Sequence, residues 1–249
     1  MNFKNIAFGL CATFFALPIF AQDYPGWPKP SAASKAYNKF KAFTNKSLTV
    51  NAKVATLVKA NKKVKTDSDE RGITQKNFDN LTTAELVTYC LTYAESFNQV
   101  CDIKTPIENE EKKILPFIAE AYEDYTLSTR QVDALKAKKT DVVNLLMAGA
   151  AKEKRIGVNY KAMLLAIGAT NAIPQLINFY KASVKKDTDI LTVLNTLMYD
   201  AKYTPFMQST TYQKLYADNT MPESERFIDF NKANEALILT RAQEFYASL

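Results

Sequence analysis

The sequence contains no histidine at all. This absence excludes the Ser-His-Asp and Cys-His catalytic arrangements, and it removes both the usual general base and the commonest zinc ligand. Glycine is also scarce, with six residues in 249, and neither phosphate-binding pattern, G-x-G-x-x-G or G-x-x-x-x-G-K-[ST], occurs. We therefore expect no cofactor and no metal site, and we expect a protein that is not an enzyme.

Carboxylate pairs are the remaining route to enzymatic chemistry. Glu120 and Asp124 lie four residues apart on an expected helix, and two suitably spaced carboxyls can hydrolyse glycosides. A solvated helix surface gives the same pattern. The stretch "DSDERG" from Asp67 is similar to the start of an EF-hand calcium loop, but Arg71 and Phe78 stand where ligands are needed. An acid-only hydrolase is the least favoured function.

Long apolar runs are absent except at the N-terminus. "MNFKN" carries one lysine and no acid, and the apolar run that follows ends at Ala21. This order predicts a signal peptide over residues 1–21, with an uncleaved anchor as the alternative. No second run approaches the roughly 18 apolar residues that indicate a spanning helix. We expect a periplasmic or extracellular protein with no transmembrane span after signal cleavage.

Acidic residues are missing from the start of the expected mature chain. Residues 24–66 contain ten lysines and no acid, whereas residues 67–249 are net acidic. This block can bind an anionic envelope glycan or lipid surface, lie against the acidic remainder of its own chain, or form a solvated face. For surface binding, we expect the contacts from Lys35, Lys39, Lys53 and Lys59. Without arginine or a stacking aromatic platform, the block does not predict a nucleic-acid partner.

The periodicity of apolar residues predicts an all-α protein. A proline-rich arm at 22–31 holds the only tryptophan and precedes a lysine-rich helical region at 32–66. A polar connection at 67–80 then leads to an all-helical domain at 81–249. The helices expected in that domain begin at Thr82 and then cover 108–126, 129–135, 140–154, 159–169, 173–184, 188–201 and 222–247.

Short helices joined by tight turns fill the range from Thr140 to Asp200, where "AIPQLI" follows "MLLAIGA". This pattern resembles a HEAT-type α-solenoid. An irregular helical bundle gives the same pattern, so both architectures remain open. The resemblance implies a broad concave face suited to peptides and proteins. The favoured function is an exported binding or adaptor protein that acts through protein–protein interaction.

Three cysteines are present, and Cys11 falls within the expected signal peptide. Cys90 and Cys101 follow a T-x-x-E capping box formed by Thr82 and Glu85. An unbroken helix would separate these cysteines by about 16 Å, whereas a disulfide needs Cα atoms within about 7 Å. Either the helix ends between them and they bond to each other, or both are buried thiols, or each pairs with another chain. For an exported protein we favour the intramolecular disulfide.

The segment "LTTAELVTYCLTY" resembles a segment of the form L-S-T-x-E-L-V-x-x-C-L-x-Y-P in many secreted proteins of the Bacteroidota. Ala94 stands where that pattern has proline. The group has no well-defined biochemistry, so the resemblance implies export and a helical domain and nothing more.

Overall fold

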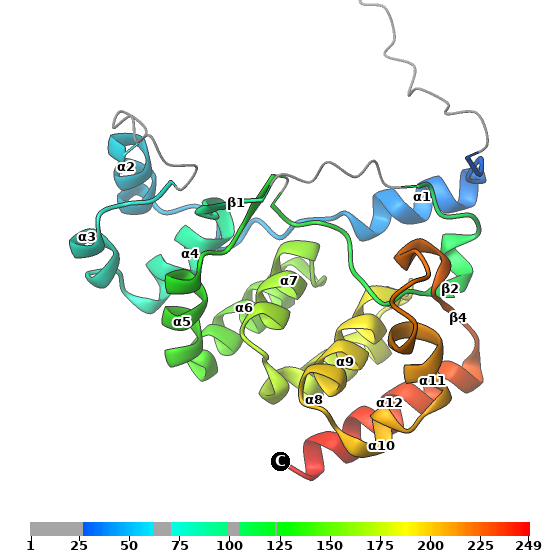
Figure 1. The fold of residues 1–249 in the computed structure, drawn as a ribbon. Coiled ribbons are helices and arrows are strands. Elements are labelled where there is room, and N and C mark those ends of the chain that lie inside the picture. The colour runs from blue at the N-terminus through cyan, green and yellow to red at the C-terminus, as the bar shows by residue number, and fades with distance from the viewer. Residues whose placement is uncertain (1–26, 62–70, 99–104, 123) are drawn as a thin grey trace, which may run out of the picture.

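The computed structural model describes residues 27–61, 71–98, 105–122 and 124–249. Over these ranges the chain is all-α, as the sequence predicts, with two short antiparallel strand pairs (Figure 1). The expected signal peptide and residues 22–26 of the proline-rich arm lie outside the described residues. No helix in the described ranges is long and apolar enough to cross a membrane.

The described elements follow one another in a simple order along the chain. The helices are α1 (Ala32–Lys41), α2 (Ala52–Asn61), α3 (Gln75–Asp79), α4 (Thr83–Thr92), α5 (Thr129–Ala137), α6 (Lys139–Glu153), α7 (Val158–Ala166), α8 (Ile173–Ala182), α9 (Thr188–Asp200), α10 (Thr204–Met207), α11 (Thr210–Tyr212) and α12 (Lys232–Ala247). The strands are β1 (Ser96–Phe97), β2 (Lys113–Ile114), β3 (Tyr125–Thr126) and β4 (Ile228–Asp229). A π-helical turn covers Gln213–Ala217.

The core is built around α9, which contacts α7, α8, α10, α12 and β2. Its apolar side chains are almost completely buried, with Leu191, Val193 and Leu194 at 0 % exposure. In a solenoid each repeat contacts only its neighbours. Here α12 and β2, which are distant in the sequence, both pack against α9. This arrangement is that of an irregular bundle.

The helix expected over 108–126 is not formed. A single 3₁₀ turn at Glu110–Lys112 leads into β2, which pairs with β4 in the register Lys113↔Asp229 and Ile114↔Ile228. Pro116 lies two residues after β2, and its missing N–H and its ring oppose a helix interior. The same strand pairing delays the final helix, expected from residue 222, until Lys232.

The start of α4 agrees with the sequence. Thr82 Oγ1 accepts a hydrogen bond from the Glu85 amide at 3.3 Å, and Glu85 Oε2 accepts one from the Thr82 amide at 2.9 Å. These reciprocal bonds form the predicted capping box. The helix ends at Thr92, so it stops between the two cysteines.

Cys90 lies on α4 as a free, fully buried thiol, so the structure does not form the expected disulfide. The expected partner, Cys101, lies outside the described residues. Burial, and then the charge of Glu95, raises the pKa of the Cys90 thiol above its usual range. Such a thiol is inert because the thiolate is the reactive form.

We expect Cys90 to resist alkylation in the native protein and to react after denaturation without a reductant. The measurement is peptide mapping by mass spectrometry of protein treated with iodoacetamide before and after denaturation. Modification of Cys90 only after reduction would show that it forms a disulfide instead.

Five charged side chains are buried together where α1 meets the start of α9. Asp189 connects two lysines, with Oδ1 at 2.7 Å from the Lys41 ammonium and Oδ2 at 3.2 Å from the Lys161 ammonium. Lys41 also contacts Glu110 at 3.0 Å, and Lys161 contacts Asp187 at 3.0 Å. None of these side chains is more than 7 % exposed. We call this set the buried ion cluster.

Electrostatics within the buried ion cluster favour the charged forms at its centre. Burial raises the pKa of the Asp189 carboxyl, but Lys161 and Lys41 together outweigh it and hold that pKa below its usual range. Burial likewise lowers the pKa of Lys41, and Asp189 and Glu110 outweigh it in the opposite direction. The central Lys41–Asp189 pair is therefore ionised at neutral pH.

The buried ion cluster shows what one lysine of the acid-free segment at residues 24–66 contacts. Lys41 lies against acidic residues of its own chain, which is one of the three alternatives for that block. Tyr37 reinforces the contact, because its hydroxyl donates to the Lys186 carbonyl at 3.0 Å and accepts from the Thr188 amide at 2.9 Å. These bonds fix α1 on the helical domain.

We expect Lys41→Met to lower the free energy of unfolding by about 3 kcal/mol, because it leaves buried carboxylates without their counter-ion. Urea unfolding followed by circular dichroism measures the change. Lys53→Met is the matched control: Lys53 pairs with Glu85 at 2.8 Å while 49 % exposed, and such pairs contribute less than about 1 kcal/mol. Equal losses in the two variants would contradict this interpretation of the cluster.

Candidate functional site

The range from Thr140 to Asp200 does not present an apolar groove. The large apolar side chains of α6 to α9 are mostly buried within the core. Val184 is the one large hydrophobic residue of this range that is strongly exposed, at 102 %. The surface that the solenoid resemblance implies for binding is therefore taken up by packing between helices.

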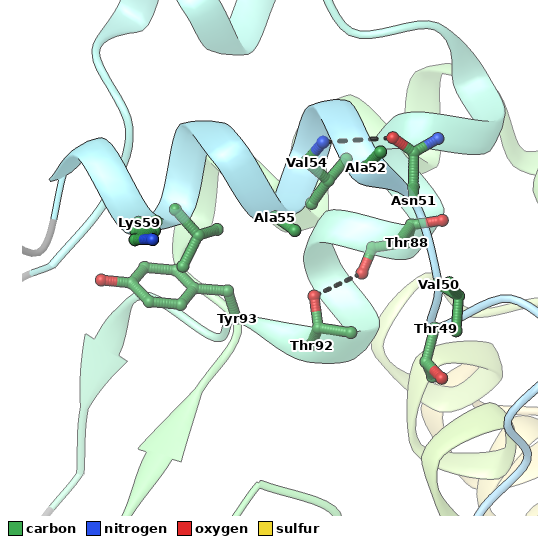
Figure 2. Close-up of a pocket in the computed structure, with 11 residues that line it drawn as sticks. Thr49, Val50, Asn51, Ala52, Val54, Ala55, Lys59, Thr88, Thr92 and Tyr93 are labelled. Atoms are coloured by element: carbon green, nitrogen blue, oxygen red, sulfur yellow. Dashed lines mark hydrogen bonds between the residues drawn. The ribbon is translucent and has the colours of Figure 1, made fainter.

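An apolar groove lies instead between α2 and α4 (Figure 2). Its cavity volume is about 510 Å³, and its walls include Ala52 and Ala55 from α2 and Thr88 and Thr92 from α4. Alanine has no side chain beyond Cβ, so the two helices can pack at one edge and still leave space between them. We call this cavity the α2–α4 groove.

The helix α2 is attached along one edge of this groove. Val54 is 2 % exposed and packs into the core. Its amide donates to the Asn51 side chain at 3.1 Å, a bond at the start of α2 that Figure 2 shows. On the outside, Lys53 forms the ion pair with Glu85 and reaches the Asn80 carbonyl at 3.4 Å. These contacts hold the wall while leaving the cavity open.

The α4 side of the groove offers few unsatisfied polar groups. The Thr88 hydroxyl donates to the Ala84 carbonyl at 3.0 Å. The Thr92 hydroxyl donates to the Thr88 carbonyl at 2.8 Å, and Figure 2 shows this second bond. Because both hydroxyls are satisfied within their own helix, they do not require a polar ligand. The groove is suited to apolar groups.

Tyr93 closes one end of the groove and is held firmly. It is 5 % exposed, and the Arg71 guanidinium lies 4.4 Å from the centre of its ring. The Tyr93 carbonyl accepts a hydrogen bond from the Gln131 side chain at 2.8 Å. The position of Tyr93 is therefore fixed by the fold, without any need for a ligand.

A buried carboxylate outside the buried ion cluster lies next to that wall, and the sequence pattern does not predict it. Glu95 is 3 % exposed and accepts hydrogen bonds from the Tyr89 hydroxyl at 2.6 Å, the Ser128 hydroxyl at 2.6 Å and Arg130 Nε at 2.8 Å. Nothing in "YAESF" distinguishes this acid from a solvated one. Gly72 leaves room for the network, because a Cβ there would lie 2.5 Å from Arg130 Nη2.

The α2–α4 groove is charged at one end only. Lys59 and Tyr93 lie at one end, Thr49 and Val50 lie at the other, and Ala55 lies between them (Figure 2). Lys59 is exposed and has no ion pair among the described residues. Val50 is 87 % exposed. The groove thus combines apolar walls, an apolar entrance and one cation.

The four lysines predicted to bind an anionic surface do not form one patch. Lys35 and Lys39 are exposed on α1, whereas Lys53 and Lys59 belong to α2. Figure 1 shows these two helices at opposite ends of the molecule. Lys53 is further committed to its ion pair with Glu85.

The predicted carboxylate pair does not share a helix face. Glu120 and Asp124 are exposed in irregular structure between β2 and β3. The Asp124 backbone carbonyl accepts a hydrogen bond from the Asn98 amide at 2.8 Å. Among the described residues no group of three or more potential metal ligands gathers in one place, and the residues 67–70 of the EF-hand-like stretch lie outside them.

Comparison with known proteins does not assign the chain to a family. No family model, no curated protein and no solved structure matches it. The function is therefore inferred from the geometry of the α2–α4 groove and of the exposed lysines.

Proposed function

We propose that this chain is a binding protein that holds an apolar segment of a partner protein in the α2–α4 groove. The observation that carries the proposal is the groove itself, an open cavity of about 510 Å³ with mainly apolar walls. Specific pockets for ligands have volumes of about 300–1,000 Å³ and are lined mainly by apolar side chains. The export expected from the sequence would place this partner in the cell envelope or outside the cell.

The shape and the charge of the groove favour a peptide segment as its occupant. Two helices bound an elongated apolar channel, which is the geometry that receives amphipathic helices and extended segments. The exposed Val50 extends the apolar surface at one end, and Lys59 supplies a cation at the other. The complementary segment has neighbouring large apolar residues followed by an acidic residue or a terminal carboxylate.

We expect Ala55→Trp to abolish binding of such a segment, because the indole fills the middle of the groove. The measurement begins with a random-peptide library selected on the purified wild-type protein. The affinity of the enriched peptides is then determined by fluorescence anisotropy. At least a tenfold weaker affinity is expected for the variant, equivalent to about 1.4 kcal/mol.

Ala60→Trp provides the matched control, because Ala60 is exposed on the same helix but does not line the groove. This variant should bind the peptides as the wild type does, and both variants should keep the wild-type thermal midpoint. Enriched peptides without apolar residues, or peptides that bind Ala55→Trp unchanged, would contradict the proposal.

A second candidate function is attachment to an anionic glycan or lipid surface. It is favoured by Lys35 and Lys39, which are exposed four residues apart on α1, a helix that contains no acid. Residues at this spacing lie on the same side of a helix. A partly basic helix can concentrate near an anionic surface through screened electrostatic attraction.

For this second function we expect cosedimentation with phosphatidylserine-containing vesicles that weakens steeply as salt increases. The double variant Lys35→Gln, Lys39→Gln should lose that binding, whereas Lys53→Gln should keep it, because Lys53 is already paired with Glu85. Binding that resists both high salt and the double variant would exclude the α1 lysines as its source.

A further inference from the structure

A second cavity, of about 690 Å³, opens at the C-terminal end of α9. One side of it is formed by Tyr199 and Asp200 of α9 and by Tyr216 of the π-helical turn. The other side is the segment between that turn and β4, which includes Asn219 and Arg226. We call this the α9-end cavity. It shares no lining residue with the α2–α4 groove.

Aromatic rings build a rigid wall in the α9-end cavity. The Tyr199 and Tyr216 rings are parallel within 8°, and their centroids lie 4.6 Å apart. The Tyr216 hydroxyl shares a hydrogen bond of 3.2 Å with the Thr196 hydroxyl. A π-helical turn is rare and occurs frequently at functional sites, and here it presents Tyr216 to the cavity.

Planar polar side chains stand around this wall. Asp200 is exposed and has no ion pair among the described residues. The Arg226 side chain is only 11 % exposed, yet its contacts are long: 3.3 Å to Glu223 and 3.4 Å to the Leu215 carbonyl. Its Nε has no hydrogen-bond partner within the described part of the chain. That Nε is itself buried. The terminal nitrogens Nη1 and Nη2 each carry a second N–H beyond these single contacts, and these are the donors that the guanidinium can offer to a ligand.

The balance of charge limits what this cavity can bind. Asp200 and Glu223 are the two carboxylates of the lining, and Arg226 is its one cation. A second cation stands beside them, because the Lys202 ammonium lies 4.1 Å from the centre of the Tyr199 ring. The charges around the cavity are therefore nearly balanced, which favours neither a polyanion nor a polycation. A purely apolar ligand would cover these charged groups without giving them partners, which is costly. The ligand that fits this lining has many groups that both donate and accept hydrogen bonds. It also has an apolar side, which can lie on the tyrosines, on Pro116 and on Met221.

We propose that the α9-end cavity binds a neutral saccharide. Asp200 and Glu223 accept hydrogen bonds from neighbouring sugar hydroxyls, while Arg226 donates and Asn219 does both. The C–H face of the sugar ring lies against the apolar part of the wall. This inference goes beyond the proposed protein-binding function and is independent of it, because the two cavities are formed by different segments.

Saturation-transfer-difference NMR on the purified protein tests the proposal. The probes are a panel of neutral mono- and disaccharides (glucose, galactose, mannose, N-acetylglucosamine, maltose and cellobiose), with glucuronate and agmatine as the charged alternatives. We expect at least one neutral saccharide to show saturation transfer at millimolar concentration, while glucuronate and agmatine do not.

Titration with the responding saccharide then locates the site. Asp200→Asn and Asn219→Ala should each weaken the affinity about tenfold, since a hydrogen bond to a charged or polar group is lost. Both residues are exposed, so both variants should fold normally. Asp133→Asn, an exposed aspartate on α5, and Ala55→Trp should leave the affinity unchanged.

Three results would overturn the proposal. The first is no saturation transfer from any neutral saccharide, and the second is preferential binding of agmatine or glucuronate. The third is saccharide binding that neither Asp200→Asn nor Asn219→Ala weakens. None of these results bears on the α2–α4 groove, whose own test uses Ala55→Trp and peptides.

Discussion

The contact on which this structure depends is the bridge that Asp189 makes between Lys41 and Lys161. It joins the first described helix to the central helix α9 and to α7, three elements that are far apart in the sequence. A buried ion pair contributes less net stability than its short distances suggest, because both charges lose their hydration. What it contributes is position: a lysine buried beside two carboxylates cannot move without leaving a charge unpaired.

This constraint explains how a lysine-rich segment becomes part of a folded bundle. Lys41 is buried and fixes α1, Lys53 is half exposed and joins α2 to Glu85, and Lys35, Lys39 and Lys59 remain in solvent. Since α1 and α2 are held at separate places, the chain between them must pass along the domain rather than continue as one helix. The opening beside α2 follows from that path, because α2 packs against the core along one side, through Val54, Leu57 and Val58.

Two cavities of different chemistry result from this packing. The α2–α4 groove is apolar because alanines and internally satisfied threonines form its walls. The α9-end cavity is polar and aromatic because a π-helical turn and an irregular segment bring Tyr216, Asn219 and Arg226 next to α9. The two proposals thus place a protein-binding surface and a saccharide site on different segments of one bundle.

Most of the local structure could be predicted from the sequence. The capping box at Thr82 and Glu85 was predicted because capping depends on residues three apart. The helices from α5 to α9 follow their apolar periodicity to within about three residues at each end, an ordinary margin for helix boundaries. The prediction of a helix over 108–126 is wrong, because Pro116 and the long-range pairing of β2 with β4 outweigh the periodic pattern of apolar residues there.

The candidate sites themselves were largely invisible in the sequence. Lys59 was singled out, but only as one of four surface lysines, and neither Glu95 nor the tyrosines of the α9-end cavity were identified. The sequence by itself determined an all-α chain, its main helices and a lysine block, because propensity, capping and periodicity are local. Only the tertiary structure decided which lysine is buried, that Cys90 is a free thiol in the core and where cavities open. These properties depend on burial and on partners that are brought together from distant segments, such as Lys41 and Asp189.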